Sequence, residues 1–167
     1  MKRGLCILMC LMILKSGWSN TSLRTYRVTL EKITLIKSET TNGSENLYGS
    51  VWAGVYCNSN DNQAGASFDS RERTLKFFER NMDKYVKIST SAPLLLNQSL
   101  VFDLPTCEGN KANFTLTASL GNQSSNRQYL TEQHRVYLSE INGSLRRTLH
   151  CYERGSHIEV SFTITQL

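Results

Sequence analysis

Hydrophobic and polar residues alternate with a period of two along much of this chain. The alternation is clearest near the end, where Ile158, Val160, Phe162 and Ile164 are interleaved with Glu159, Ser161, Thr163 and Thr165. Successive side chains of a strand point to opposite faces, so this pattern predicts a strand with one face in a core and the other in water. Half-buried strands of this kind are typical of antiparallel sheets.

The same alternation recurs at residues 113–120. Its apolar set, which we expect to face the core, comprises Phe114, Leu116, Ala118 and Leu120. Asn113 and Thr115 occupy the other phase, and we therefore expect both to face water.

Other segments rich in β-branched and aromatic residues predict further strands. They are residues 26–36, 47–57, 86–90, 100–104, 136–138 and 147–152. The polar stretches 40–46, 58–65 and 121–127 predict loops between them. About eight strands, with no internal repeat and no linker, indicate a single all-β domain built as an antiparallel β-sandwich.

One region is open to a second interpretation. Four apolar residues are spaced as one stripe of a helix, with Asp69 or Ser70 available as its N-cap: Leu75, Phe78, Met82 and Tyr85. A short helix within residues 70–87 is therefore the alternative to strand structure there.

The first 19 residues have the composition of a secretory signal peptide. Lys2 and Arg3 precede an apolar run from Leu5 to Leu14, and residues 17–19 resemble a cleavage site before Asn20. This apolar run is too short for a transmembrane helix, which needs about 20 residues, and no later segment approaches that length. We expect residues 20–167 to form one secreted, extracellular domain.

Removal of the signal peptide would change the charge of the chain. The signal peptide carries three basic residues and no acidic one, so the formal net charge of the chain would fall from +5 to +2. A weakly cationic domain argues against a dedicated nucleic-acid surface, which needs clustered Lys and Arg.

Six Asn-x-Ser/Thr triplets predict N-glycosylation in a secreted chain. The acceptor residues are Asn20, Asn42, Asn97, Asn113, Asn122 and Asn142.

Three cysteines remain once Cys6 and Cys10 leave with the signal peptide. They are Cys57, Cys107 and Cys151. In an oxidising compartment this number predicts one disulfide and one odd thiol, which is either buried and inert or linked to a second chain.

Residues 47–57 have two faces of different character. Leu47, Val51, Ala53, Val55 and Cys57 share one phase, and Tyr48, Trp52 and Tyr56 share the other, with Gly54 between two of the rings. We call Tyr48, Trp52 and Tyr56 the aromatic row. If exposed, the row could stack on sugar rings, bind an apolar ligand or pack against another subunit, and if buried on both faces it is core.

The order of the segments supports a resemblance to a known family. The segments that carry it are 28–35, 42–55, 99–105, 114–120, 136–141 and 158–164, and they include Tyr48 in a strand that follows a polar loop. In this order the chain resembles the calcium-and-lipid-binding β-sandwich domain of protein kinase C and synaptotagmin. The resemblance implies architecture, which by itself carries no function.

The resemblance has two further implications. It places the ends of the strands that finish at Cys57 and Leu104 at one pole, which makes Cys57 and Cys107 the disulfide candidate and leaves Cys151 as the unpaired or interchain candidate. It also locates the family's calcium loops, where calcium needs about 6 to 8 oxygen ligands. Here the first loop has only Glu39 and Glu45, and residues 121–127 have no acid. We therefore expect no metal site and no cofactor.

No motif in the sequence indicates catalysis. His134, His150 and His157 do not form a zinc-type His-x-x-x-His spacing, and there is no nucleophile elbow or phosphate-binding loop. His150 and Cys151 are neighbours, which a strand would point to opposite faces. We expect a non-enzymatic protein.

Two functions fit these observations. The first is a secreted binding module that recognises a glycan, a lipid surface or a protein partner through its loops or the aromatic row. The alternative is a structural, protective or storage subunit of an extracellular oligomer, of the egg-fluid or matrix type, which the odd cysteine and the many glycosylation triplets favour.

Overall fold

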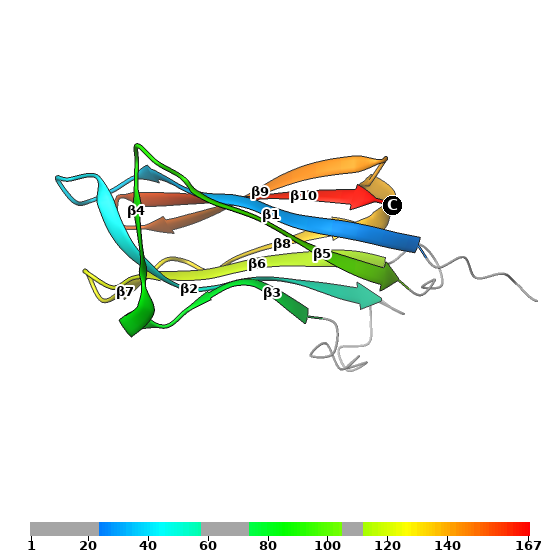
Figure 1. The fold of residues 1–167 in the computed structure, drawn as a ribbon, viewed down its shortest axis with the longest axis horizontal. Helices are drawn as coiled ribbons and strands as arrows, with labels where there is room; N and C mark the ends of the chain where they lie inside the picture. The colour runs from blue at the N-terminus through cyan, green and yellow to red at the C-terminus, as the bar shows by residue number, and fades with distance from the viewer. Residues whose placement is uncertain (1–23, 58–73, 105–111) are drawn as a thin grey trace, which may run out of the picture.

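The chain folds into two antiparallel sheets that pack face to face (Figure 1). The structure, a computed structural model, describes residues 24–57, 74–104 and 112–167. The predicted signal peptide, Asn20, Cys107 and the side chain of Cys57 therefore lie outside the described part, and what the sequence indicates for them stays a prediction.

Ten strands in the described ranges form the two sheets. The four-stranded sheet has the order β5-β1-β10-β9, and the six-stranded sheet has the order β3-β2-β6-β7, with β4 paired to β2 and β8 paired to β6. The bounds are β1 Arg24–Lys37, β2 Ser44–Cys57, β3 Thr74–Arg80, β4 Val86–Ser89, β5 Leu94–Leu104, β6 Ala112–Asn122, β7 Arg127–Gln128, β8 Glu132–Tyr137, β9 Ser144–Glu153 and β10 Ser156–Gln166. The predicted all-β antiparallel sandwich is confirmed, and every predicted strand segment overlaps an observed strand.

The helix considered within residues 70–87 is not formed in its described part. Residues 74–80 are β3, Met82–Lys84 form a 3₁₀ turn, and β4 follows. β3 pairs with β2, and its register shifts because Val51 pairs with Phe78 and Trp52 with Lys76. Phe77 is therefore an extra residue of β3, and the adjacent Phe77 and Phe78 are both in the core. Pairing with β2 and burial of these two rings override the helical spacing. No helix in the described part is long and apolar enough to span a membrane.

The core lies between the sheets and is filled by the inward phase of each long strand. In β10 this phase is Ile158, Val160, Phe162 and Ile164, none of which has exposed surface. Aromatic rings join the two layers: Phe114 of β6 meets Tyr26 of β1 and Phe102 of β5 edge to face, at centroid distances of 5.6 and 5.5 Å. Such pairs add roughly 0.5–1.5 kcal/mol each to the burial of their surface.

The prediction that Asn113 and Thr115 face water is wrong. Both lie on the outer side of β6, yet Asn113 has 0% and Thr115 3% of its surface exposed. β6 is a central strand between β2 and β8, and its outward residues are short. In register, Asn113 lies between Tyr56 of β2 and Tyr137 of β8, so larger neighbours cover it.

The glycosylation triplets divide into exposed and buried positions. Asn42, Asn97 and Asn142 are exposed, whereas Asn122, at the end of β6, is 4% exposed and accepts a hydrogen bond from the backbone of Ser124. A glycan on a side chain without exposed surface would prevent the observed packing, so the fold disfavours Asn113 and Asn122 as acceptors. Glycosylation of the three exposed residues stays a prediction.

β2 and β5 end at the same pole of the sandwich (Figure 1), as the resemblance implied. The strand ends at Cys57 and Leu104 therefore lie at one pole. The Cys57–Cys107 pairing itself stays a prediction.

A buried carboxyl group links the two sheets at the opposite end of β2. Glu45 of β2 accepts a hydrogen bond of 2.5 Å from the hydroxyl of Ser156 in β10, and another from the hydroxyl of Tyr129. Only 2% of Glu45 is exposed. Burial raises the pKa of Glu45 above its ordinary value of 4.5, and the hydrogen bond from Ser156 opposes part of that rise.

We expect Glu45→Gln to change how stability depends on pH. Because the folded carboxyl has the higher pKa, the folded state binds more protons than the unfolded state once the pH exceeds about 4.5, so the native protein loses stability as the pH rises through the folded pKa. The amide introduced by the substitution cannot ionise, so the variant should gain stability relative to the native protein between pH 4 and pH 7. Urea unfolding at several pH values measures this difference, and parallel curves would contradict the raised pKa.

Candidate functional site

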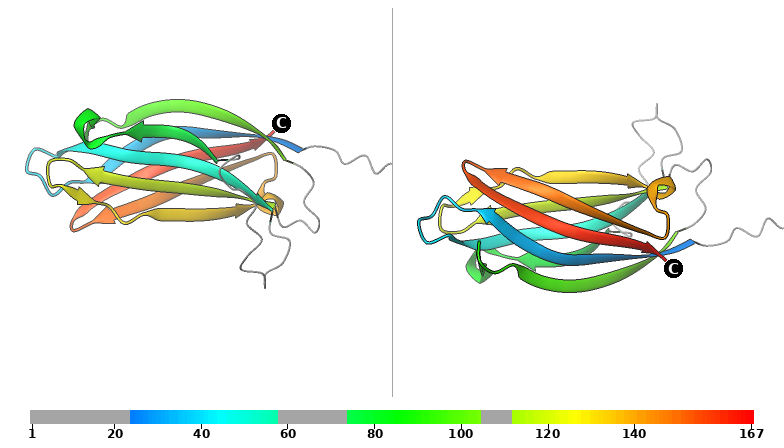
Figure 2. Two further views of the ribbon diagram at one scale, coloured as in Figure 1. Left: turned by 90° about the horizontal axis from the view of Figure 1, so that it is seen from below. Right: turned by 90° about the horizontal axis from the view of Figure 1, so that it is seen from above.

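The aromatic row lies on the outer face of the six-stranded sheet. This sheet faces the viewer in the left panel of Figure 2. Leu47, Val51, Ala53 and Val55 of the same strand are buried in the core. Tyr48, Trp52 and Tyr56 point the other way and are half-buried. No further layer covers them in the described part of the chain, so each side chain keeps some surface in solvent.

Two glycines let the tyrosine rings pack against the sheet. A Cβ atom built on Gly121 of β6 would lie 2.3 Å from Cζ of Tyr48, so the ring occupies the space of the missing side chain. A Cβ on Gly54 would lie 3.0 Å from a ring carbon of Tyr56. Glycine in a strand permits this close approach of a ring to backbone. The two rings therefore have fixed positions and do not extend freely into solvent.

Polar side chains of β6 and β8 continue the same face. The register places Trp52 beside Thr117, with Gln133 on the far side of Thr117. It likewise places Tyr56 beside Asn113, with Tyr137 on the far side. Gln133 and Tyr137 are exposed, and so is Arg135 between them. The hydroxyl of Thr117 is buried and has no hydrogen-bond partner. The outer face thus combines aromatic rings with amide, hydroxyl and guanidinium groups.

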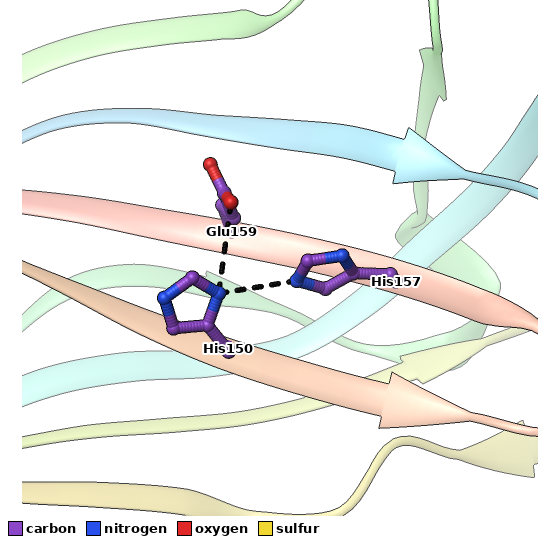
Figure 3. Close-up of side chains that lie close together, drawn as sticks. All are labelled: His150, His157 and Glu159. Atoms are coloured by element: carbon purple, nitrogen blue, oxygen red, sulfur yellow. Dashed lines mark hydrogen bonds and ion pairs between the residues drawn. The ribbon is translucent and has the colours of Figure 1, made fainter.

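A second cluster lies on the outer face of the four-stranded sheet (Figure 3). Nδ1 of His150 in β9 is 3.2 Å from Nε2 of His157 in β10 and 3.6 Å from a carboxylate oxygen of Glu159. The ring of Tyr152 stacks on His157 at a centroid distance of 4.4 Å and an interplanar angle of 18°. We call His150, His157 and Glu159 the histidine cluster.

Sequence reasoning missed the histidine cluster because it searched for metal-type spacing within one segment. The residues come from the two strands of a hairpin, where His150 pairs with Glu159 and Tyr152 pairs with His157. The chain turns at residues 154–155, where Arg154 and Gly155 have φ of 35° and 130°. Recognising this hairpin turn in the sequence would have placed the residues before it opposite those after it. His134 lies on β8 of the other sheet, away from this cluster.

Cys151 points from β9 into the core and is a free thiol with no exposed surface. Burial, and to a smaller extent the negative charge of Glu132, raises the pKa of the Cys151 thiol to about 12. Of the two roles left open for the odd cysteine, burial favours the inert thiol over an interchain link.

Comparisons with known proteins give structural likenesses but no match in sequence. No family model matches the chain, and no curated protein matches it in sequence. Among solved structures, the chain is similar to a C2 domain of plant extended synaptotagmin 1, with 10% sequence identity and a TM-score of 0.42, over 87% of this chain and 96% of that chain. The likeness is to the family that the order of the sequence segments loosely resembles. It concerns architecture and implies no shared ligand.

The contact between Tyr48 and Gly121 predicts coupled effects of substitution. Gly121→Ala should destabilise the protein by about 1–3 kcal/mol, because the new methyl group and the ring cannot share one position. In Tyr48→Ala the ring is gone, so adding Gly121→Ala to it should cost much less. Urea unfolding of both single variants and the double variant measures the coupling, and additive losses would contradict the contact.

Cys151 should resist alkylation in the folded protein. The thiolate is the reactive form, and a buried thiol with a raised pKa supplies almost none of it. We expect iodoacetamide to leave the tryptic peptide of residues 148–154 unmodified in native protein and to modify it in guanidinium chloride, as followed by mass spectrometry. A Cys151-linked dimer on a non-reducing gel would contradict this assignment.

Proposed function

We propose that this protein is a secreted, non-enzymatic binding module that recognises a glycan through the outer face of β2, β6 and β8. The observation that carries the proposal is the aromatic row, which is half-buried on the outer face and has two of its rings, Tyr48 and Tyr56, packed against glycines. Rigid aromatic side chains lose little conformational entropy on binding and provide much contact area.

The chemistry around the aromatic row favours a glycan over the other partners considered. Sugar rings have apolar faces that stack on aromatic side chains and hydroxyl groups that need hydrogen-bond partners. Gln133, Arg135 and the Tyr137 hydroxyl are exposed beside the row and offer such partners. A lipid surface would be attracted by clustered basic residues, and on the outward phases of β2, β6 and β8 Arg135 is the single basic residue.

The positions of the exposed glycosylation triplets leave this face open. Asn97 lies on β5 of the other sheet, and Asn42 and Asn142 lie in connections between strands. The triplet on the outer face itself, at Asn113, is buried. Glycans on the three exposed residues would therefore leave the aromatic row accessible.

The storage or structural role remains the competing proposal, and it has lost one support. An interchain bond was one of its two arguments, and a buried Cys151 does not favour it. A subunit of a large particle would need to cover the aromatic row with a neighbouring chain.

Trp52→Ala should lower glycan binding at least tenfold. Ten-fold corresponds to about 1.4 kcal/mol, and tryptophans at the centre of an interface often contribute about 2 kcal/mol or more. A glycan array with the labelled protein, followed by titration of the best ligand, measures the loss. Tyr85→Ala is the matched control, because Tyr85 is exposed and lies outside the row.

Native mass spectrometry on the same samples distinguishes the competing proposal. A monomer whose glycan binding depends on Trp52 and not on Tyr85 supports the binding module. A discrete particle of many copies in which Trp52 is shielded from acrylamide, without glycan binding, would contradict it and favour the storage subunit.

A further inference from the structure

The hairpin of β9 and β10 presents a set of metal-binding side chains on a rigid support. The two strands pair continuously from Ser144 with Thr165 to Glu153 with Ser156. Leu149, Cys151, Ile158 and Val160 of the hairpin are buried. Alternation therefore places His150, Tyr152, His157 and Glu159 together on the outer face.

Two distances within the histidine cluster match those of a metal coordination shell. Zinc bound to nitrogen and oxygen at about 2.0–2.1 Å in a tetrahedron holds its ligand atoms about 3.4 Å apart. In the cluster, Nδ1 of His150 is 3.2 Å from Nε2 of His157 and 3.6 Å from the Glu159 oxygen. One ligand atom from each of the three residues lies within 4.8 Å of the other two.

The donor set selects the class of ion. Two imidazole nitrogens and one carboxylate oxygen suit zinc and related divalent transition metals. Calcium and magnesium prefer shells of oxygen ligands and would find one carboxylate here. The single negative charge of the Glu159 carboxylate also offsets part of the charge of a divalent cation.

The site needs little rearrangement to bind an ion. The ligands stand on paired strands, and the Tyr152 ring stacks on His157 at 4.4 Å, which limits rotation of that imidazole. His150 is exposed, and His157 and Glu159 are half-buried, so an ion can reach the cluster from solvent. Prepositioned ligands reduce the entropy lost on binding.

We propose that His150, His157 and Glu159 form a binding site for one divalent transition-metal ion of the zinc class. The three side chains supply three ligands, and a fourth position remains open to water. This site lies on the sheet opposite the aromatic row and does not depend on glycan binding.

Isothermal titration calorimetry with zinc chloride, on secreted protein without a polyhistidine tag, tests the proposal. We expect one ion per chain, and at least tenfold weaker binding in each of the variants His150→Ala, His157→Ala and Glu159→Gln. His134→Ala is the matched control, because His134 is an exposed histidine on β8 of the other sheet. Its binding should equal that of the native protein, and a large excess of calcium or magnesium chloride should not compete.

A second measurement separates loss of the site from loss of the fold. Zinc should raise the melting temperature of the native protein and of His134→Ala, because it binds the folded state. It should not raise that of the double variant His150→Ala/His157→Ala, whose circular dichroism spectrum should remain native because these side chains lie outside the core. Absence of zinc binding by the native protein, or equal binding by the folded double variant, would overturn the proposal.

Discussion

The apolar layer between the two sheets determines which side chains of the described strands face inward and which face outward. The ring of Phe114 meets the rings of Tyr26 and Phe102 edge to face across that layer. These contacts fix which residues of β6, β1 and β5 face inward. A shift of one residue in any strand would exchange its inner and outer sets, which makes the phase strongly specified. Because Ile158 and Val160 of β10 are in the core, His157 and Glu159 must face outward. The same reasoning for β2 turns the aromatic row outward.

Facing outward does not have the same consequence in every strand. Asn113 lies in β6, which has β2 on one side and β8 on the other. The larger side chains of its cross-strand neighbours, Tyr56 and Tyr137, cover it. His150 lies in β9, which is an edge strand of the four-stranded sheet, and it remains exposed. The place of a strand in its sheet therefore decides whether an outward polar residue becomes a surface group or a covered one.

This difference explains which features could be predicted from sequence. Strands β6 and β10 were recognisable because their apolar and polar residues occupy separate phases, and β2 because it is rich in β-branched and aromatic residues. β3 was ambiguous because Leu75 and Phe78 fit a helical stripe as well, and a bulge opposite β2 that buries both Phe77 and Phe78 cannot be read from periodicity. The exposure of Asn113 was predicted wrongly, since alternation identifies a side of the sheet and not the residues that cover it.

The two candidate surfaces differ in the same respect. The aromatic row comes from one strand, so its residues could be grouped from β2 alone. The histidine cluster combines two strands, and only the register of the hairpin unites His150 with Glu159. A local motif search cannot detect such a set, although the turn at Gly155 contains the information that aligns it.

The core also separates these surfaces from each other. The aromatic row and the histidine cluster lie on opposite outer faces, as the two views of Figure 2 show for their sheets, and the buried residues of both layers lie between them. Residues without shared neighbours usually act independently. A substitution of an exposed side chain on one outer face should therefore not alter the arrangement of the buried residues or of the side chains on the other outer face. The two-layer fold can in this way support aromatic stacking on one side and metal ligands on the other, with a single core that supports both.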